Sequence, residues 1–255
     1  MQVDTSKVTS IDLTGGATLT RTGTTTVSNK TAGVYDLKIP GLNVAASGVL
    51  ADGSLTTLSD GRKVSATFAG LNYSLLGTWA VTPAQGGANT AYFGMAVSGY
   101  QTPGGALPSI GSATYVGNSS SGAGAGGVVG ALFVASGSAI QHAATLQGNA
   151  SMTVSFFNNT VTGTLSDMTT TDIFAGVTSP WNSVNLSGNL VGVNVLGNTT
   201  TSSATGALAF DGSSKGTFNG SLFGPKAEEA AAVWSLHDNT GGGKTAVGMF
   251  AATKQ

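Results

Sequence analysis

The sequence predicts a mainly β protein, and three features of its 255 residues carry this prediction. Turn-forming pairs such as Asp52-Gly53, Asn158-Asn159 and Asp211-Gly212 recur along the chain. Short runs rich in Val, Thr, Phe and Leu lie between these pairs. Helical periodicity of the apolar residues is nearly absent. We therefore expect short antiparallel strands that are joined by tight turns.

The clearest hairpin joins residues 151–157 to residues 160–166. Met152, Val154 and Phe156 share one face of its first strand. Asn158-Asn159 is a suitable two-residue turn because Asn tolerates positive φ. Further along, the alternation of apolar residues changes phase after Leu190, which predicts a bulge or bend of the kind that a closing barrel needs. A third hairpin is expected to turn at residues 211–216.

Residues 223–232 depart from the strand pattern. Gly224 can cap a helix, Pro225 suits the first helical position, and Glu228 and Glu229 then lie near the positive end of the helix dipole. We expect one or two helical turns here, with both glutamates in solvent, as a short plug over a barrel mouth. Strands are expected to follow at 233–236 and 245–253.

Charge is sparse, at a net −1 from 10 basic and 11 acidic residues, which gives no electrostatic footprint for nucleic acid or anionic membrane. No Lys, Arg, Asp or Glu lies between Val64 and Ser166, so this third of the chain cannot house carboxylate acid–base chemistry. The absence of Cys excludes disulfides, iron–sulfur clusters and thiol nucleophiles. The most apolar window, residues 128–134, is far shorter than the roughly 20 residues of a membrane-spanning helix.

Two glycine-rich stretches imitate nucleotide-binding motifs. Residues 238–245 nearly match a P-loop, but the chain that follows looks like a strand, whereas a P-loop leads into a helix. Residues 122–127 fit the dinucleotide pattern, but the next acidic residue is the distant Asp167. No nucleophile elbow and no metal-ligand spacing is present. We expect loops at both stretches, no catalytic residue, no metal site and no enzyme.

Two stretches together resemble transferrin-binding-protein-B-like surface proteins. Leu-Pro-Ser-Ile-Gly-Ser-Ala-Thr-Tyr-Val-Gly at residues 107–117 is similar to the segment that opens the barrel of that family. Gly-Thr-Phe-Asn-Gly-Ser-Leu-Phe-Gly-Pro-Lys-Ala-Glu-Glu at residues 216–229 is similar to the signature near its end. The resemblance implies a C-terminal eight-stranded antiparallel β-barrel at 108–255. It also implies an N-terminal β-rich "handle" domain at 1–107, which would hold the ligand.

The resemblance also implies a function. Members of the family are exported by Gram-negative bacteria, and some capture host transferrin, lactoferrin, haemoglobin or complement factor. The hemophilin branch consists of soluble haem scavengers and is closest in size to one handle and one barrel. A hemophore of this kind would bind haem (heme), take it from a host haemoprotein or another haem source, and deliver it to a TonB-dependent outer-membrane receptor after export by a surface-lipoprotein translocator. The alternative is a non-enzymatic surface protein that binds a host protein without binding haem.

Residues 1–4 begin no apolar run, so we expect a mature secreted or outer-membrane-surface form without its signal peptide. Haem requires an apolar cleft, an axial His or Tyr, and a cation or hydroxyl near its propionates. The handle has no His, so His142 and His237 of the barrel half are the candidate axial ligands. His142 is preferred, on an expected loop that folds over the handle. The candidate pocket residues of the handle are Tyr35, Tyr73, Tyr92, Tyr100, Arg62 and Lys63.

Overall fold

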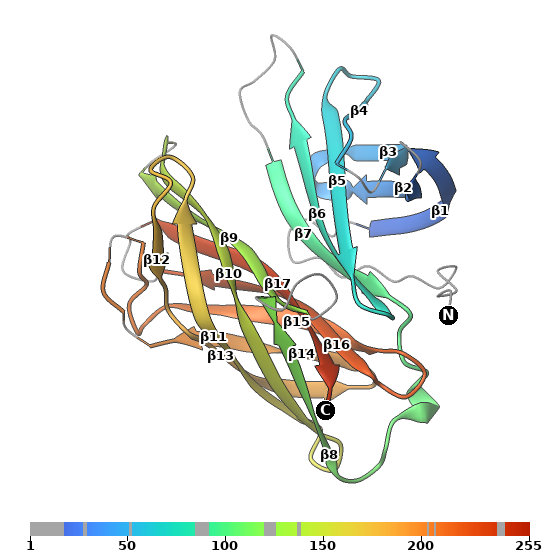
Figure 1. The fold of residues 1–255 in the computed structure, drawn as a ribbon, viewed down its shortest axis with the longest axis vertical. Coiled ribbons are helices and arrows are strands. Elements are labelled where there is room, and N and C mark those ends of the chain that lie inside the picture. The colour runs from blue at the N-terminus through green and yellow to red at the C-terminus, as the bar shows by residue number, and fades with distance from the viewer. Residues whose placement is uncertain are drawn as a thin grey trace.

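A computed structural model describes most of the chain beyond residue 17, namely residues 18–27, 30–50, 53–84, 92–119, 126–136, 139–202, 204–206, 208–238 and 243–255. Their strands form three antiparallel sheets, and none of these residues lies in an α-helix (Figure 1). Short 3-10 turns occur at η2 (Pro40–Leu42) and η3 (Gly104–Ala106). No helix in the described ranges has the length and apolar character needed to cross a membrane. The mainly β prediction is therefore confirmed.

The handle consists of two small sheets. One has the order β1 (Thr18–Val27), β2 (Lys30–Ile39), β3 (Val44–Leu50), and the other β4 (Thr56–Thr57), β5 (Lys63–Gly70), β6 (Ser74–Thr82), β7 (Tyr92–Gly99). Buried residues of both sheets, including Leu37, Ile39, Val64 and Trp79, form one apolar cluster. The sheets therefore pack face to face around a core of their own.

The barrel is closed, as the sequence predicted. Its strands are β8 (Ser112–Asn118), β9 (Gly127–Ser136), β10 (Ala139–Ser155), β11 (Thr160–Asp172), β13 (Val184–Val191), β14 (Asn194–Thr201), β15 (Lys215–Phe223), β16 (Glu229–His237) and β17 (Lys244–Lys254). Both β8 and β9 pair with β10 on one side and with β17 on the other. They therefore occupy one position in two pieces, so the barrel has eight strand positions. The short β12 (Thr178–Pro180) pairs with the end of β11.

Three sequence expectations for the barrel differ in outcome. The hairpin at 151–166 is confirmed, because β10 and β11 pair with Val154 opposite Val161, and Met152, Val154 and Phe156 are all buried. Its turn takes the four residues 156–159, so the expected two-residue turn at Asn158-Asn159 is wrong. The bulge expected after Leu190 is wrong, because the chain reverses there and β13 and β14 pair around Gly192, which has φ 61. The change of phase in the apolar pattern therefore marks a new strand. Residues 208–210 do not form the strand expected before the turn at 211–216.

The helix expected at 223–232 is wrong. Residues 224–227 form one tight turn, in which the Ala227 N–H donates to the Gly224 carbonyl at 3.3 Å, and β16 begins at Glu229. Ala230 and Ala232 of β16 face the barrel core, whereas Ala231 and Val233 face the handle. A strand that is buried on both faces has no polar alternation, so its alanine run looked like a helix.

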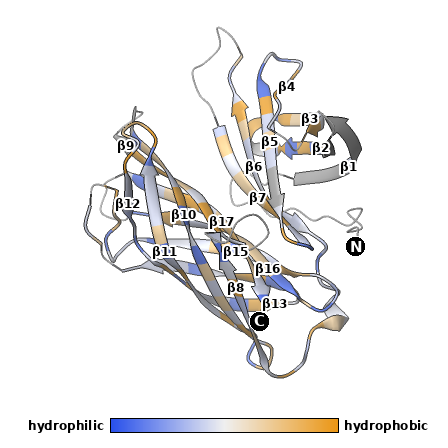
Figure 2. Cartoon of the chain, viewed as in Figure 1, coloured by the Kyte–Doolittle hydropathy of each residue, from blue (hydrophilic) through white to orange (hydrophobic). Residues whose placement is uncertain are grey.

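The far face of the second handle sheet lies against the outside of the barrel (Figure 1). Leu76, Met95 and Val97 of the handle share an apolar cluster with barrel residues that include Phe223 and Met249. Figure 2 shows hydrophobic and hydrophilic residues interspersed along the strands, as expected for strands with one face in a core and one in solvent. The predicted boundary at 107/108 lies between the end of β7 and the start of β8.

Candidate functional site

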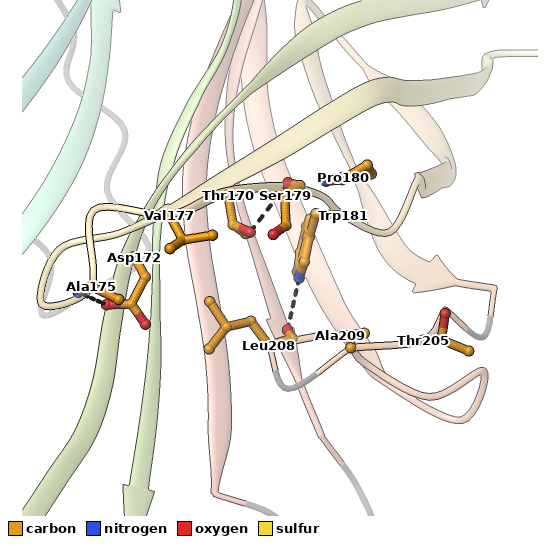
Figure 3. A pocket seen from close by; sticks show the side chains of 11 residues that line it. Thr170, Asp172, Ala175, Val177, Ser179, Pro180, Trp181, Thr205, Leu208 and Ala209 are labelled. Carbon is orange, nitrogen blue, oxygen red and sulfur yellow. Dashed lines mark hydrogen bonds between the residues drawn. The ribbon is translucent and has the colours of Figure 1, made fainter.

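A cavity of about 470 Å³ opens at the mouth of the barrel where β11 ends (Figure 3). Its walls come from the end of β11, the β11–β12 connection, β12 and the loop before β15. They are Thr170, Asp172, Ala175, Val177, Ser179, Pro180, Trp181, Thr205, Gly206, Leu208 and Ala209. Figure 3 shows Val177, Trp181 and Leu208 directed toward the same space, with Asp172 at one end. This volume is in the range of small-molecule sites.

The Trp181 side of the cavity is fixed by hydrogen bonds. The Trp181 Nε1–H donates to the Leu208 carbonyl at 2.9 Å, and the Phe210 ring meets the indole edge-on with centroids 5.4 Å apart. The buried Asn182 amide exchanges hydrogen bonds of 2.9 Å with the Phe210 backbone in both directions. These contacts hold the loop before β15 against the start of β13, so this wall is preorganised.

Asp172 provides the charge at the cavity edge. Its Oδ1 accepts the N–H groups of Phe174 at 2.8 Å and Ala175 at 2.9 Å. Its Oδ2 lies 3.2 Å from Nδ1 of His142. The backbone donors of Ala175 and Phe174, and then His142, hold the Asp172 pKa below its ordinary value. The carboxylate is therefore ionised at neutral pH, and no Lys or Arg lines the cavity.

The structure places His142 within β10, next to a register shift between Ile140 and His142, so the expected loop is wrong. The segment extends the barrel wall because Ala143 and Ala144 pair with Phe133 and Leu132 of β9. The side chain of His142 is 46% exposed and stands at the rim of the barrel mouth beside Asp172. Because Asp172 engages Nδ1, Nε2 is the nitrogen left for a further ligand.

The other histidine lies elsewhere. His237 is the last residue of β16 and is exposed, with Nδ1 3.3 Å from the Thr245 hydroxyl. Strands β17 and β9 separate β16 from β10 in the sheet order. The structure therefore does not bring the two predicted axial ligands into one site.

The predicted tyrosines of the handle are also dispersed. Tyr35 is buried in the core between the two handle sheets, and Tyr92 is exposed at the start of β7. Tyr73 and Tyr100 lie together at the junction with the barrel, where the Tyr100 N–H donates to the Tyr73 carbonyl at 2.8 Å. None of these four lines the barrel-mouth cavity.

Of the two predicted cations of the handle, Arg62 stands beside η2. Arg62 donates to the carbonyls of Leu42 at 2.9 Å and Asn43 at 3.0 Å, and it pairs with Asp60 at 2.7 Å. Its guanidinium therefore ties the two handle sheets together. Lys63 is exposed at the start of β5.

Sequence reasoning missed the role of Glu229, which is 1% exposed and joins the two domains. Its Oε1 accepts the N–H of Asn72 at 2.8 Å, and both of its carboxylate oxygens accept the N–H of Tyr73 at 3.1 Å. Its Oε2 also accepts the N–H of Ser74 at 2.8 Å and the Ser74 hydroxyl at 2.7 Å. The available signal was a carboxylate directly before an apolar run, because a charge at the start of a buried strand requires hydrogen-bond partners.

A second group of contacts supports this junction. Nε2 of Gln101 donates to Asn194 at 2.8 Å and to Ser221 at 2.7 Å. The buried Thr102 hydroxyl donates to the Gly224 carbonyl at 2.8 Å. The connection between the domains is therefore hydrogen-bonded to the barrel on several strands.

Comparisons with known proteins identify this architecture. The model of the C-lobe and N-lobe β-barrels of Tf-binding protein B matches residues 107–254. No curated protein matches the chain.

Solved transferrin-binding protein B structures share the whole fold. A double mutant from Haemophilus parasuis Hp5 has a TM-score of 0.56 at 18% identity, and covers 98% of this chain and 44% of its own. Isotype 1 from serogroup B Neisseria meningitidis has a TM-score of 0.52 at 18% identity, and covers 97% of this chain and 43% of its own. Intact Ap-TbpB, with N and C lobes, has a TM-score of 0.54 at 17% identity, and covers 97% and 45%.

The chain thus spans less than half the length of these structures, and at such identity the likeness shows the fold. The family model matches more than half of the chain, including every barrel strand from β8 to β17. The chain belongs to the family of transferrin-binding protein B β-barrels.

Proposed function

We propose that this protein is a non-enzymatic binding protein of the bacterial surface or the secreted fraction, and that it captures a host iron-carrier protein. The observation that carries the proposal is the joint presence of the family barrel and a handle that is fixed to it through buried Glu229. Such a junction holds the loops of both domains in one arrangement, which lowers the entropy cost of binding a large partner.

A direct binding panel tests this proposal. The purified chain is immobilised, and iron-loaded transferrin, iron-free transferrin, lactoferrin and haemoglobin are passed over it, with serum albumin as the control. We expect saturable binding of at least one carrier with a Kd in the micromolar range or below. Binding of all four carriers that is no stronger than albumin binding rejects the proposal.

Haem is the second candidate, and the pair formed by His142 and Asp172 favours it. Histidines that coordinate a metal through one ring nitrogen commonly donate the N–H of the other to a carboxylate. The 3.2 Å contact between Nδ1 of His142 and Oδ2 of Asp172 allows this arrangement. Lys244 donates to the carbonyl of the cavity residue Ala209 at 2.6 Å, which places a cation close to the cavity for a propionate. These contacts support haem as a candidate, with His142 as an axial ligand that stands at the rim and outside the lining of the cavity. Bound haem would supply the iron to be transferred.

Hemin titration tests this candidate. Wild-type protein should show a shifted Soret band, which His142→Ala abolishes and the matched His237→Ala leaves unchanged. The absence of a Soret shift in the wild type rejects haem binding, and a shift that survives His142→Ala rejects this ligand. If haem binds, the hemophore hypothesis further proposes two partners. They are a TonB-dependent outer-membrane receptor that takes up the haem and a surface-lipoprotein translocator that exports the protein.

A further inference from the structure

We propose that the end of the barrel opposite its mouth binds the surface of a phospholipid bilayer, through apolar side chains on three neighbouring turns. These side chains are Ile110, Phe157 and Val191, and we call them the basal patch. The proposal goes beyond capture of a host protein, because it assigns a lipid contact to a part of the barrel that the cavity does not use.

The three side chains of the basal patch stand in solvent. Phe157 is 73% exposed, Ile110 is 71% exposed and Val191 is 56% exposed. The first two fractions exceed those of every other large apolar side chain that the structure describes. Single exposed apolar residues are ordinary, whereas a contiguous exposed group marks a contact with a protein or a membrane.

Backbone hydrogen bonds place the three turns side by side. The Phe156 N–H donates to the Gly111 carbonyl at 2.9 Å, which joins the β10–β11 turn to the segment before β8. The Leu190 N–H donates to the Asn159 carbonyl at 2.9 Å, which joins the same turn to the end of β13. The basal patch is therefore one surface that is built from segments far apart in the sequence.

The barrel holds the basal patch outward before any lipid binds. Phe156 and Leu190 are buried in the barrel core. The residues that follow them, Phe157 and Val191, are therefore directed away from the core. Since the core anchors already fix both turns, a contact through them costs little conformational entropy.

The three turns carry no charge, because residues 64–166 and 173–210 include no Asp, Glu, Lys or Arg. Four charged residues lie at the same end of the barrel, namely Lys226 and Glu228 of the β15–β16 turn, Glu229 at the start of β16 and Lys254 at the end of β17. The other charged residues of the barrel lie along β11 or at the mouth, namely Asp167, Asp172, Asp211, Lys215, Asp238 and Lys244. Because Glu229 is buried, two lysines and one glutamate remain at the base. Neither a zwitterionic nor an anionic lipid surface is therefore repelled.

The composition of the turns favours a bilayer over a protein partner. Protein interfaces draw most of their binding free energy from Trp, Tyr and Arg, and residues 107–111, 156–159 and 191–193 include none of these. Apolar side chains gain from burial among acyl chains without a matching recess, because the hydrophobic effect is non-directional. The exposed amides of Asn158 and Asn159 can meanwhile form hydrogen bonds with the lipid headgroups.

A lipid contact at the base leaves the barrel mouth free. Strand β11 begins at Thr160, beside the basal patch, and ends at Asp172 in the wall of the barrel-mouth cavity. The two features thus lie at opposite ends of one strand. A barrel that rests on a bilayer through its base therefore presents its mouth to the aqueous side.

Cosedimentation of the full chain with phosphatidylcholine vesicles tests the proposal, because this lipid offers apolar contact without net charge. We expect binding that persists when NaCl is raised from about 0.1 M to about 0.5 M, since salt screens charge contacts and not apolar ones. Phe157→Ser should weaken binding about tenfold or more. The matched control is Phe174→Ser, since Phe174 is 70% exposed beyond the other end of β11. Unchanged circular dichroism and Tm would show that both variants fold, because both side chains lie in solvent.

Phe157→Trp reports the position of the side chain directly. The native Trp79, Trp181 and Trp234 are all buried, so their emission should change little when vesicles are added. The new indole should shift its emission to the blue on phosphatidylcholine vesicles and should be quenched by doxyl-labelled phosphatidylcholine. Phe174→Trp should show neither effect.

The outcomes separate this proposal from the proposed function. A wild type that does not cosediment with the vesicles overturns it, as does release of the protein by salt. Equal binding of the wild type and Phe157→Ser, or equal losses in Phe157→Ser and Phe174→Ser, overturns the assignment to the basal patch. Loss of carrier binding in Phe157→Ser, without vesicle binding by the wild type, would reassign the patch to a protein contact. The carrier panel contains no lipid, so its failure rejects the proposed function alone.

Discussion

Glu229 and Ser74 join the barrel to the handle through two hydrogen bonds on one carboxylate oxygen, from the Ser74 N–H at 2.8 Å and from its hydroxyl at 2.7 Å. The two residues are 155 positions apart in the chain. The backbone N–H groups of Asn72 and Tyr73 also donate to this carboxylate. All hydrogen-bond donors to this buried carboxylate come from the other domain. The contact therefore fixes the orientation of the two domains.

Glu229→Ala should therefore destabilise the protein more than other single charge removals. Three backbone N–H groups and the Ser74 hydroxyl would lose their acceptor, and both Ser74 donors are buried, so we expect a loss of about 3 kcal/mol or more in the free energy of unfolding. Urea unfolding measures this loss, and hydrogen exchange at residues 72–74 should accelerate.

The matched control for this variant is Glu228→Gln. The Glu228 carboxylate accepts one N–H, from Lys226 at 2.8 Å, within its own turn. Its replacement should cost less than about 1 kcal/mol. Equal losses for the two variants would contradict the special role of Glu229.

Sequence patterns predicted those strands that have one apolar face and one polar face. The hairpin of β10 and β11 alternates between core and solvent, so its two strands were readable. Its register was not, because the expected two-residue turn would set Phe157 opposite Thr160, where the structure has Ser155. Strand β16 alternates between barrel core and handle instead, and both environments are apolar. Only the tertiary structure distinguishes such a strand from a short apolar helix.

The candidate site was less predictable, because the strands of the β10–β11 hairpin extend well beyond the residues 151–166 that the alternation marks. His142 and Asp172 are 30 residues apart, and neither local sequence carries a binding motif. The long hairpin brings them together, since Ala144 of β10 lies opposite Asp172 at the end of β11. The role of Glu229 was not predictable either, because its hydrogen-bond donors in the handle are far from it in the sequence.

Gly248→Ala should destabilise the barrel core. A Cβ at this position of β17 would lie 2.5 Å from Cε2 and Nε1 of Trp234, which is fully buried. The indole cannot move away freely in a close-packed core, so we expect a loss of about 1–3 kcal/mol. Gly104→Ala is the control, because nothing lies within 4 Å of its added Cβ. Thermal unfolding of both variants checks this, and equal Tm values would contradict the packing argument.

Asp172→Asn should flatten the dependence of stability on pH in the acid range. The folded-state pKa of Asp172 is lowered, chiefly by the N–H groups of Ala175 and Phe174. Its carboxylate therefore stabilises the fold above the unfolded-state pKa of about 3.9, and this contribution is lost as the pH falls through the lower folded-state value. Unfolding free energies from pH 7 to pH 2 should decline more steeply in the wild type than in the variant.

A second carboxylate tests the sign of that effect. The pKa of Asp60 is also lowered, first by the backbone N–H of Arg62 and then by its guanidinium. Asp60→Asn should therefore flatten the same acid limb of the profile. A steeper decline in either variant than in the wild type would contradict the assignment of these hydrogen bonds to the ionised forms.

Tyr115→Phe should destabilise the protein at neutral pH and alter its response to alkali. The buried Tyr115 hydroxyl donates to the Ala227 carbonyl at 3.0 Å, within the turn that precedes β16. Loss of this bond leaves a buried carbonyl unpaired, which costs about 1 kcal/mol or more.

Burial, followed by the nearby Glu228 carboxylate, raises the pKa of Tyr115. The stability that its neutral form confers is therefore complete below the unfolded-state value of about 10, and is lost as the pH rises beyond it. Urea unfolding between pH 7 and pH 11 should show a steeper alkaline decline in the wild type than in Tyr115→Phe. Tyr92→Phe removes a hydroxyl from an exposed ring of the handle and is the matched control. Parallel alkaline profiles for the wild type and Tyr115→Phe would show that the buried hydroxyl does not govern this limb.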